Sequence, residues 1–226
     1  MMPGKGRLPS LSAALAGIPA GIQVLGPWSG RRQLFVRFAV EAETATIYTS
    51  DALRGELARL RARSRYHSIA IVGRDALAES EFLKAAFPEK PELPLMIDHD
   101  GQRPDALEAL VSSLSLVQVT LDGSETAPAL ECVSRSLAVA AKAGAPHALA
   151  IAPPETASDA TLLRIVEQMH GASAGTQVVV HPTGDRVSER DRVSERDRRW
   201  VMWLEQAMAV HEDVRVIPRW PAAPAR

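Results

Sequence analysis

The chain has 226 residues, 46% of them hydrophobic, which is enough for one domain with a buried core. Its 26 basic and 27 acidic residues leave a net charge of −1, so no global field points to nucleic acid or an anionic membrane as a partner. The single cysteine, Cys132, excludes an internal disulfide and any metal site built from several cysteines. A cytoplasmic location fits this cysteine usage.

The ends of the chain differ in composition from its middle. Proline and serine interrupt the apolar residues near the start, and the last six residues read PAAPAR. We expect a flexible N-terminal tail over residues 1–20, a single domain over 21–220 and a C-terminal tail over 221–226. No apolar run reaches the ~18 residues that a membrane span needs, so we expect no membrane partner.

Between the tails, apolar segments of two kinds alternate. Short, nearly continuous apolar runs predict strands at 33–39, 68–72, 94–98, 116–121, 147–152, 177–181 and 214–218. Helical periodicity predicts helices at 51–63, 78–87, 104–113, 129–143, 158–170 and 195–210. Ser50 or Asp51 is expected to cap the first helix and Ser158 the fifth, with Pro104 in the first turn of the third.

This alternation is typical of parallel βαβ units and predicts an α/β fold. Six or seven units in roughly 190 residues are too few for an eight-stranded barrel. We therefore predict a partial (β/α)6 barrel, with a doubly wound open sheet as the alternative. The hexamer RVSERD occurs twice in tandem, at 186–191 and 192–197, and we interpret it as a duplication tolerated at the solvated start of a helix rather than as a charged docking surface.

The segment around the first predicted strand is the most informative about function. Gln23, Gly26, Pro27 and Gly30 precede the strand QLFVRFA. In order and spacing this segment resembles the opening of the radical S-adenosylmethionine (radical SAM) enzymes, most closely 7-carboxy-7-deazaguanine synthase, in which it helps to cover the substrate site. The resemblance extends over about residues 23–218 and implies a radical-SAM-like partial barrel for the whole of 21–220.

The residues that would carry the family's chemistry are missing. The resemblance places the three cysteines of the C-x-x-x-C-x-x-C cluster loop at Glu41, Ala45 and Tyr48. Iron–sulfur clusters are held by thiolates, which these side chains cannot supply. The family's G-G-E-P segment, which grips S-adenosylmethionine, reads Gly73-Arg74-Asp75-Ala76 here, so Gly73 and Asp75 are a degenerate remnant of a cofactor-binding site.

Other loops that follow strands depart from the family as well. Residues 97–101 read IDHDG where the family has L-E-T-N-G, and residues 122–124 replace a lysine-bearing segment. The D-H-D run invites a metal interpretation, but adjacent strand residues point to opposite faces, so we favour an ordinary polar turn and predict no metal. His181 follows the sixth strand and could form an acid–base pair with Asp98 or Asp75 at the barrel mouth.

These observations predict a catalytically degenerate, radical-SAM-like protein without an iron–sulfur cluster or other cofactor, acting as a binding or partner subunit. Its partner would be another protein or a second copy in a homodimer, and its small-molecule ligand stays unknown. The alternative is a repurposed non-radical enzyme that uses His181, Asp98 and Asp75, and a decayed gene product without a selected role is a third interpretation. Trp200 and Trp203 on the last helix are expected to pack in the core rather than to form a partner patch.

Overall fold

The computed structural model describes residues 11–40, 43–73, 75–182 and 190–217, with residues 190–197 described through their backbone alone. One ten-stranded sheet runs through this part of the chain, in the order β10-β9-β8-β7-β6-β5-β3-β1-β4, with β2 paired to β3. The strands are β1 (Ser12–Gly17), β2 (Ala20–Ile22), β3 (Arg32–Phe38), β4 (Thr46–Thr49), β5 (Ser68–Val72), β6 (Leu95–His99), β7 (Leu116–Leu121), β8 (His147–Ile151), β9 (Gln177–Val180) and β10 (Val214–Val216).

The helices follow the strands along the chain. They are α1 (Ser50–Arg63), α2 (Ser80–Ala86), α3 (Pro104–Glu108), α4 (Ala127–Lys142), α5 (Asp159–Ala172) and α6 (Arg190–Val210), with short 3-10 turns η1 (Ala76–Glu79) and η2 (Val111–Ser113). β3 and the strands from β5 to β10 are parallel, whereas β1, β2 and β4 are antiparallel to their neighbours. The predicted α/β class is therefore confirmed, with a mixed sheet.

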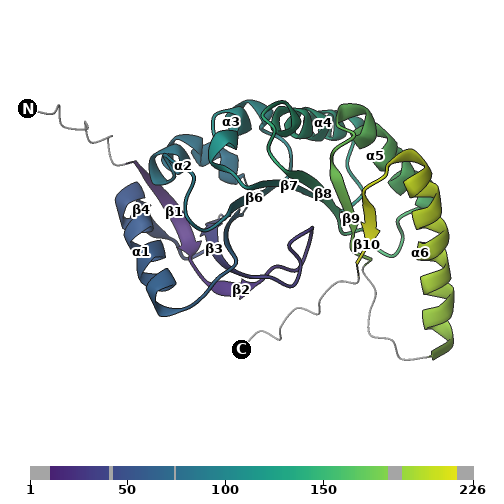
Figure 1. Ribbon diagram of the computed structural model, residues 1–226, viewed down its shortest axis with the longest axis horizontal. Helices are drawn as coiled ribbons and strands as arrows, with labels where there is room; N and C mark the ends of the chain where they lie inside the picture. Colours follow the sequence, from purple (N-terminus) through teal and green to yellow (C-terminus); the bar gives the residue numbers. More distant parts are fainter. Residues whose placement is uncertain (1–10, 41–42, 74, 183–189, 218–226) are drawn as a thin grey trace, which may run out of the picture.

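The sheet is curved and open, and the described helices line its convex side (Figure 1). No pairing closes it between β10 and β4 among the described residues. A doubly wound sheet carries helices on both faces, so that alternative is wrong for this arrangement. No helix in the described ranges is long and apolar enough to cross a membrane.

Alternating side chains divide the strands between two environments. One set packs under the helices in two apolar clusters, which include Leu34 and Leu95 in one and Leu149 and Val178 in the other. The other set faces the concave side, where Met96, Leu116 and Ala148 join a smaller cluster. Because both faces of the central strands carry apolar residues, these strands read as continuous apolar runs in the sequence.

Three expectations need correction. The prediction of a flexible tail over residues 1–20 is wrong for residues 12–17, which form β1 and pair with both β3 and β4, so the sheet begins well before residue 21. Thr49 rather than Ser50 or Asp51 caps α1, because its side chain accepts a hydrogen bond from the Ala52 amide. The helix expected over 104–113 is α3 followed by η2.

The predicted helix starts and the predicted tryptophan packing are confirmed, whereas some predicted segments lie outside the described residues. Ser158 caps α5, and Pro104 lies in the first turn of α3, both as predicted. Trp203 is buried, and Trp200 packs against it edge to face with ring centroids 5.8 Å apart, so the pair belongs to the core. Residues 1–10, 218–226 and the first four residues of the RVSERD repeat lie outside the described residues.

Candidate functional site

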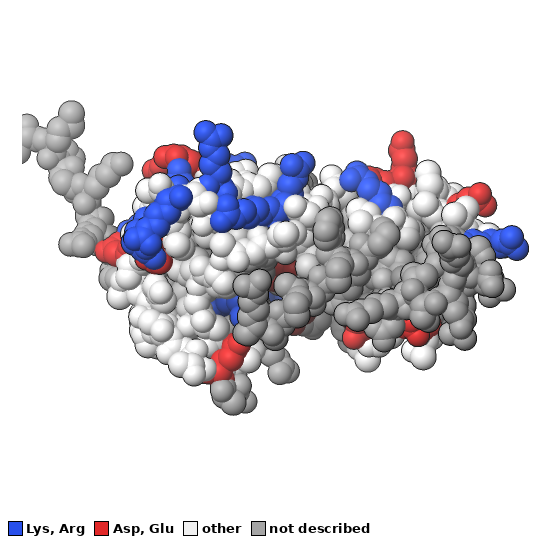
Figure 2. Space-filling view, turned by 90° about the horizontal axis from the view of Figure 1, so that it is seen from below, with Lys and Arg blue, Asp and Glu red and all other residues white. Residues whose placement is uncertain are grey.

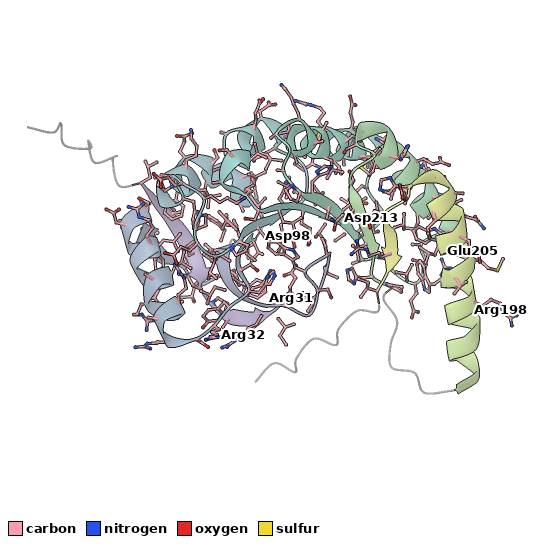
Figure 3. All side chains as sticks on the ribbon, viewed as in Figure 1. Arg31, Arg32, Asp98, Arg198, Glu205 and Asp213 are labelled. Atoms are coloured by element: carbon pink, nitrogen blue, oxygen red, sulfur yellow. The ribbon has the colours of Figure 1, made fainter. Side chains whose placement is uncertain are left out.

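The concave face of the sheet carries Asp98 and His181, two of the polar residues that the sequence predicts as a candidate site. Leu95 and Ile97 pack under the helices, so alternation directs Met96 and Asp98 to the concave side. Figure 3 shows Asp98 inside the arc of the sheet. His181 directly follows β9 and is fully buried. Both of these acid–base candidates therefore belong to this side of the molecule.

A loop between β2 and β3 covers part of this face. Within the loop the Gln23 amide donates to the Arg31 carbonyl at 2.9 Å, and the Gly30 amide donates to the Gln23 carbonyl at 2.8 Å. Trp28 packs with the concave apolar cluster and meets the His67 ring edge to face at 5.0 Å. The loop is thus anchored both to itself and to the sheet.

Gly26 is the closest point of contact between this loop and the sheet. Its amide donates to Nε2 of His181 at 2.7 Å, which requires that nitrogen to be unprotonated. Gly26 has a φ of 77°, and a Cβ there would lie 1.8 Å from Oε1 of Gln118 on β7. A glycine is needed here for both its backbone conformation and its lack of a side chain.

Asp98 forms a short polar network with β7. The Thr120 hydroxyl donates to Oδ1 of Asp98 at 2.6 Å, and Nε2 of Gln118 donates to Thr120 at 3.2 Å. Asp98 keeps some exposed surface, yet the atoms around its carboxyl remove most of its solvation. This desolvation raises the pKa of Asp98 to about 6, against the opposing hydrogen bonds from Thr120 and Gln118. A carboxyl of that pKa can take up and release a proton near neutral pH.

Asp98 and His181 are not on neighbouring strands. β7 and β8 lie between β6 and β9, which separates the two backbones by roughly 14 Å along the sheet. Gln118 and Gly26 fill the space beside them through the contacts described above. The structure thus places the two side chains on one face and surrounds each with its own partners.

Asp75, the third candidate, is held in an ion pair. Its carboxylate accepts two hydrogen bonds from the guanidinium of Arg103, which precedes α3, and both side chains are partly exposed. Asp75 has a φ of 57°, a left-handed conformation uncommon for a residue other than glycine. Arg103 therefore occupies the carboxylate that the resemblance would assign to S-adenosylmethionine.

The backbone around position 73 explains why a glycine stands there. Its φ is 122°, and a Cβ would lie 2.8 Å from the backbone oxygen of Phe38 at the end of β3. The close approach of two strand ends therefore requires glycine at this position without any ligand. Arg74, between Gly73 and Asp75, lies outside the described residues.

The D-H-D run covers the last two residues of β6 and the first residue of the turn that follows. His99 is buried on the face opposite Asp98, and its Nδ1 accepts from the Gly101 amide at 3.1 Å. Desolvation lowers the pKa of His99 to about 4, against a weaker attraction from Asp100. Asp100 is exposed and accepts a hydrogen bond from the Gln102 amide. Within the described ranges, no group of three or more potential ligands is arranged to hold a metal ion.

Two of the three positions matched to cluster cysteines, Ala45 and Tyr48, are described, and they lie just before and within β4. Tyr48 lies in β4, pairs with Ala13 of β1 and packs against the apolar core. Ala45 is exposed in the connection before β4, and Glu41 lies outside the described residues. The chain's one cysteine, Cys132, is on α4 and therefore on the convex side.

Sequence reasoning missed Gln118, Thr120 and the contact made by Gly26. The signal for the first two is their polarity within the otherwise apolar strand LVQVTL, since alternation puts both on one face. The Gly26 contact joins residues 155 positions apart, which no local pattern predicts.

Charged groups of both signs lie around the edge of the molecule seen from below, while its described centre is mostly uncharged (Figure 2).

Comparisons with known proteins do not assign this site. No protein-family model matches the chain, and no curated protein is significantly similar to it.

Proposed function

We propose that the chain is a degenerate, radical-SAM-like partial (β/α)6 barrel, similar to 7-carboxy-7-deazaguanine synthase, that acts by binding as a partner subunit. One observation carries the proposal: the chain's one thiol, Cys132, lies on a convex-side helix, remote from the loop that follows β3. A cluster needs several thiolates in one loop region, and one thiol does not meet that requirement.

Two further features support a scaffold that binds rather than reacts. The sheet contains parallel strands, and the loop bearing Gln23, Gly26 and Gly30 covers part of its concave face. The remnant of the S-adenosylmethionine segment is committed elsewhere, with Gly73 against Phe38 and Asp75 paired to Arg103. Retained strand cores with altered strand-end loops favour a stable fold with a changed function.

Anaerobic reconstitution with ferrous iron and sulfide tests the proposal. We expect no stoichiometric iron and sulfide in the desalted protein and no visible absorbance of a cluster. The Cys132→Ser variant is the matched control, since any substoichiometric uptake that it removes was bound by the half-buried thiol of Cys132. Uptake of one cluster per chain would overturn the proposal.

A second candidate function, acid–base catalysis on the same scaffold, draws on the raised pKa of Asp98. It would use Asp98 as the proton-transferring group and His181 as a positioning residue beside the Gly26 amide. Screening with small hydrolysable substrates tests this alternative. Turnover that Asp98→Asn abolishes, while Asp105→Asn on exposed α3 leaves it intact, would favour catalysis over binding.

A further inference from the structure

The outer face of α6 exposes large apolar side chains. Val201, Met202 and Met208 are 56%, 55% and 53% exposed, whereas Trp203 and Ala207 on the opposite face are buried in the core. A helix that covers a sheet normally presents polar residues to water. Three exposed apolar side chains within eight residues of one helix indicate a contact surface.

Two opposite charges flank Val201 and Met202 on this face, and Met208 lies beyond the second of them. Arg198 and Glu205 are seven residues apart, almost two turns, and therefore share the face that carries Val201 and Met202. Both point away from the body of the molecule (Figure 3). In the part of the chain whose side chains are described, neither forms a salt bridge, whereas the neighbouring Arg199 pairs with Asp159 of α5 at 2.6 Å.

We infer that this face binds a second copy of the chain, with the two α6 helices antiparallel. When Arg198 lies opposite Glu205 of the second copy, two-fold symmetry places Glu205 opposite the other Arg198 as well. The same register brings Val201 against Met202 of the second copy, and the reverse, so the apolar pairs lie between the two ion pairs. Parallel helices at the same level would instead put arginine opposite arginine and glutamate opposite glutamate.

The size of the surface sets the strength of the contact. The twelve or so residues from Arg198 to Ala209 extend roughly 18 Å along the helix. One helix pair of this length buries less than the ~800 Å² per partner of a standard stable interface. We therefore expect a reversible dimer whose dissociation constant is micromolar or weaker. This surface supplies a partner for the binding role proposed above, and it does not rest on the absence of a cluster.

Sedimentation velocity over a wide range of protein concentration tests this inference. The wild type should move from monomer to dimer as concentration rises, and added salt should shift the transition to higher concentration. Arg198→Glu and Glu205→Arg should each weaken the dimer roughly tenfold, because each turns two attractive pairs into repulsive ones. The double variant carrying both substitutions restores opposite charges and should recover wild-type association.

Two further variants separate the surface from general charge effects. Met202→Glu should abolish the dimer, and Glu131→Arg on the exposed side of α4 should leave it unchanged. Circular dichroism of each variant establishes that it is folded. A wild type that stays monomeric at every accessible concentration, or a folded double variant that stays as weak as the single ones, would overturn the inference. Neither result would alter the outcome of cluster reconstitution, which tests the proposed function separately.

Discussion

Asp98 and His99 are adjacent on β6 and respond to pH in opposite directions. The pKa of Asp98 rises from 3.8 to about 6 on folding, so its contribution to stability is full below pH 3.8 and is lost as pH rises through 6. The pKa of His99 falls from 6.5 to about 4, so its contribution is full above pH 6.5 and is lost as pH falls through 4. Between these limits the two effects largely offset each other.

Replacing either residue should expose the pH dependence of the other. We expect Asp98→Asn to lose stability as pH falls from 7 to 4.5, by up to about 3 kcal/mol, because His99 alone then resists protonation. His99→Asn, which can still accept from the Gly101 amide, should gain stability over the same interval. Urea unfolding at both pH values measures these differences. Parallel pH profiles for the wild type and both variants would contradict the assignment.

Two glycines provide a matched test of backbone constraint. Gly73→Ala should destabilise the protein by about 2 kcal/mol or more, since its Cβ would meet the Phe38 backbone and φ is 122°. Gly55→Ala should stabilise it by about 0.5–1 kcal/mol, because Gly55 is exposed in α1 with nothing within 4 Å of the added atom. Thermal and urea unfolding measure both effects. Equal effects of the two substitutions would show that the Gly73 contact is unimportant.

Among the structural elements, the loop between β2 and β3 depends on one contact. Gly26→Ala should displace this loop, because the added Cβ would overlap the Gln118 side chain. We expect faster tryptic cleavage after Arg31 and Arg32, which Figure 3 shows at the base of the loop. Gly144→Ala is the control, since Gly144 also has a positive φ but nothing lies within 4 Å of its added Cβ. Equal cleavage rates in the two variants would argue against this anchor.

The parallel strands and most helices could be predicted from the sequence, whereas the antiparallel ones could not. Strands such as SIAIV and HALAI are unbroken apolar runs, and Ser158 and Pro104 mark helix starts by local chemistry. β1 reads SAALAG, whose small residues have no strong strand preference, and it forms because β3 and β4 pair with it. Whether such a segment forms a strand is decided by the strands, distant in sequence, that pair with it.

The candidate site could be predicted only in part, because some of its contacts join residues that are distant in sequence. Strand alternation and strand ends were enough to direct Asp98 and His181 to one side of the sheet. The partners of these residues were not predictable, because Thr120, Gln118 and Gly26 reach them across the sheet. The Asp75–Arg103 pair likewise joins two loops through side chains that carry no local signal.

At the scale of the whole molecule, two apolar clusters share one continuous sheet. Leu34 belongs to the cluster around β3 to β6, and Leu149 to the cluster around β8 and β9, while β7 contributes Val117 to one and Val119 to the other. We expect Leu34→Ala and Leu149→Ala each to cost about 2–5 kcal/mol and to shift one common transition. Tryptophan fluorescence and far-ultraviolet circular dichroism should give coincident unfolding curves. Two separated transitions would mean that the halves unfold independently.

The strand order also bears on how the chain folds during synthesis. From β6 onward each strand pairs with the strand made just before it, and Ser12 and Thr49, 37 residues apart, are among the most widely spaced of the paired residues. Among the described strands, no pairing joins the first ones in the chain to the last ones. Growth can therefore proceed from the N-terminal side on the ribosome, each new βα unit adding to an edge already in place, without waiting for a distant segment to arrive.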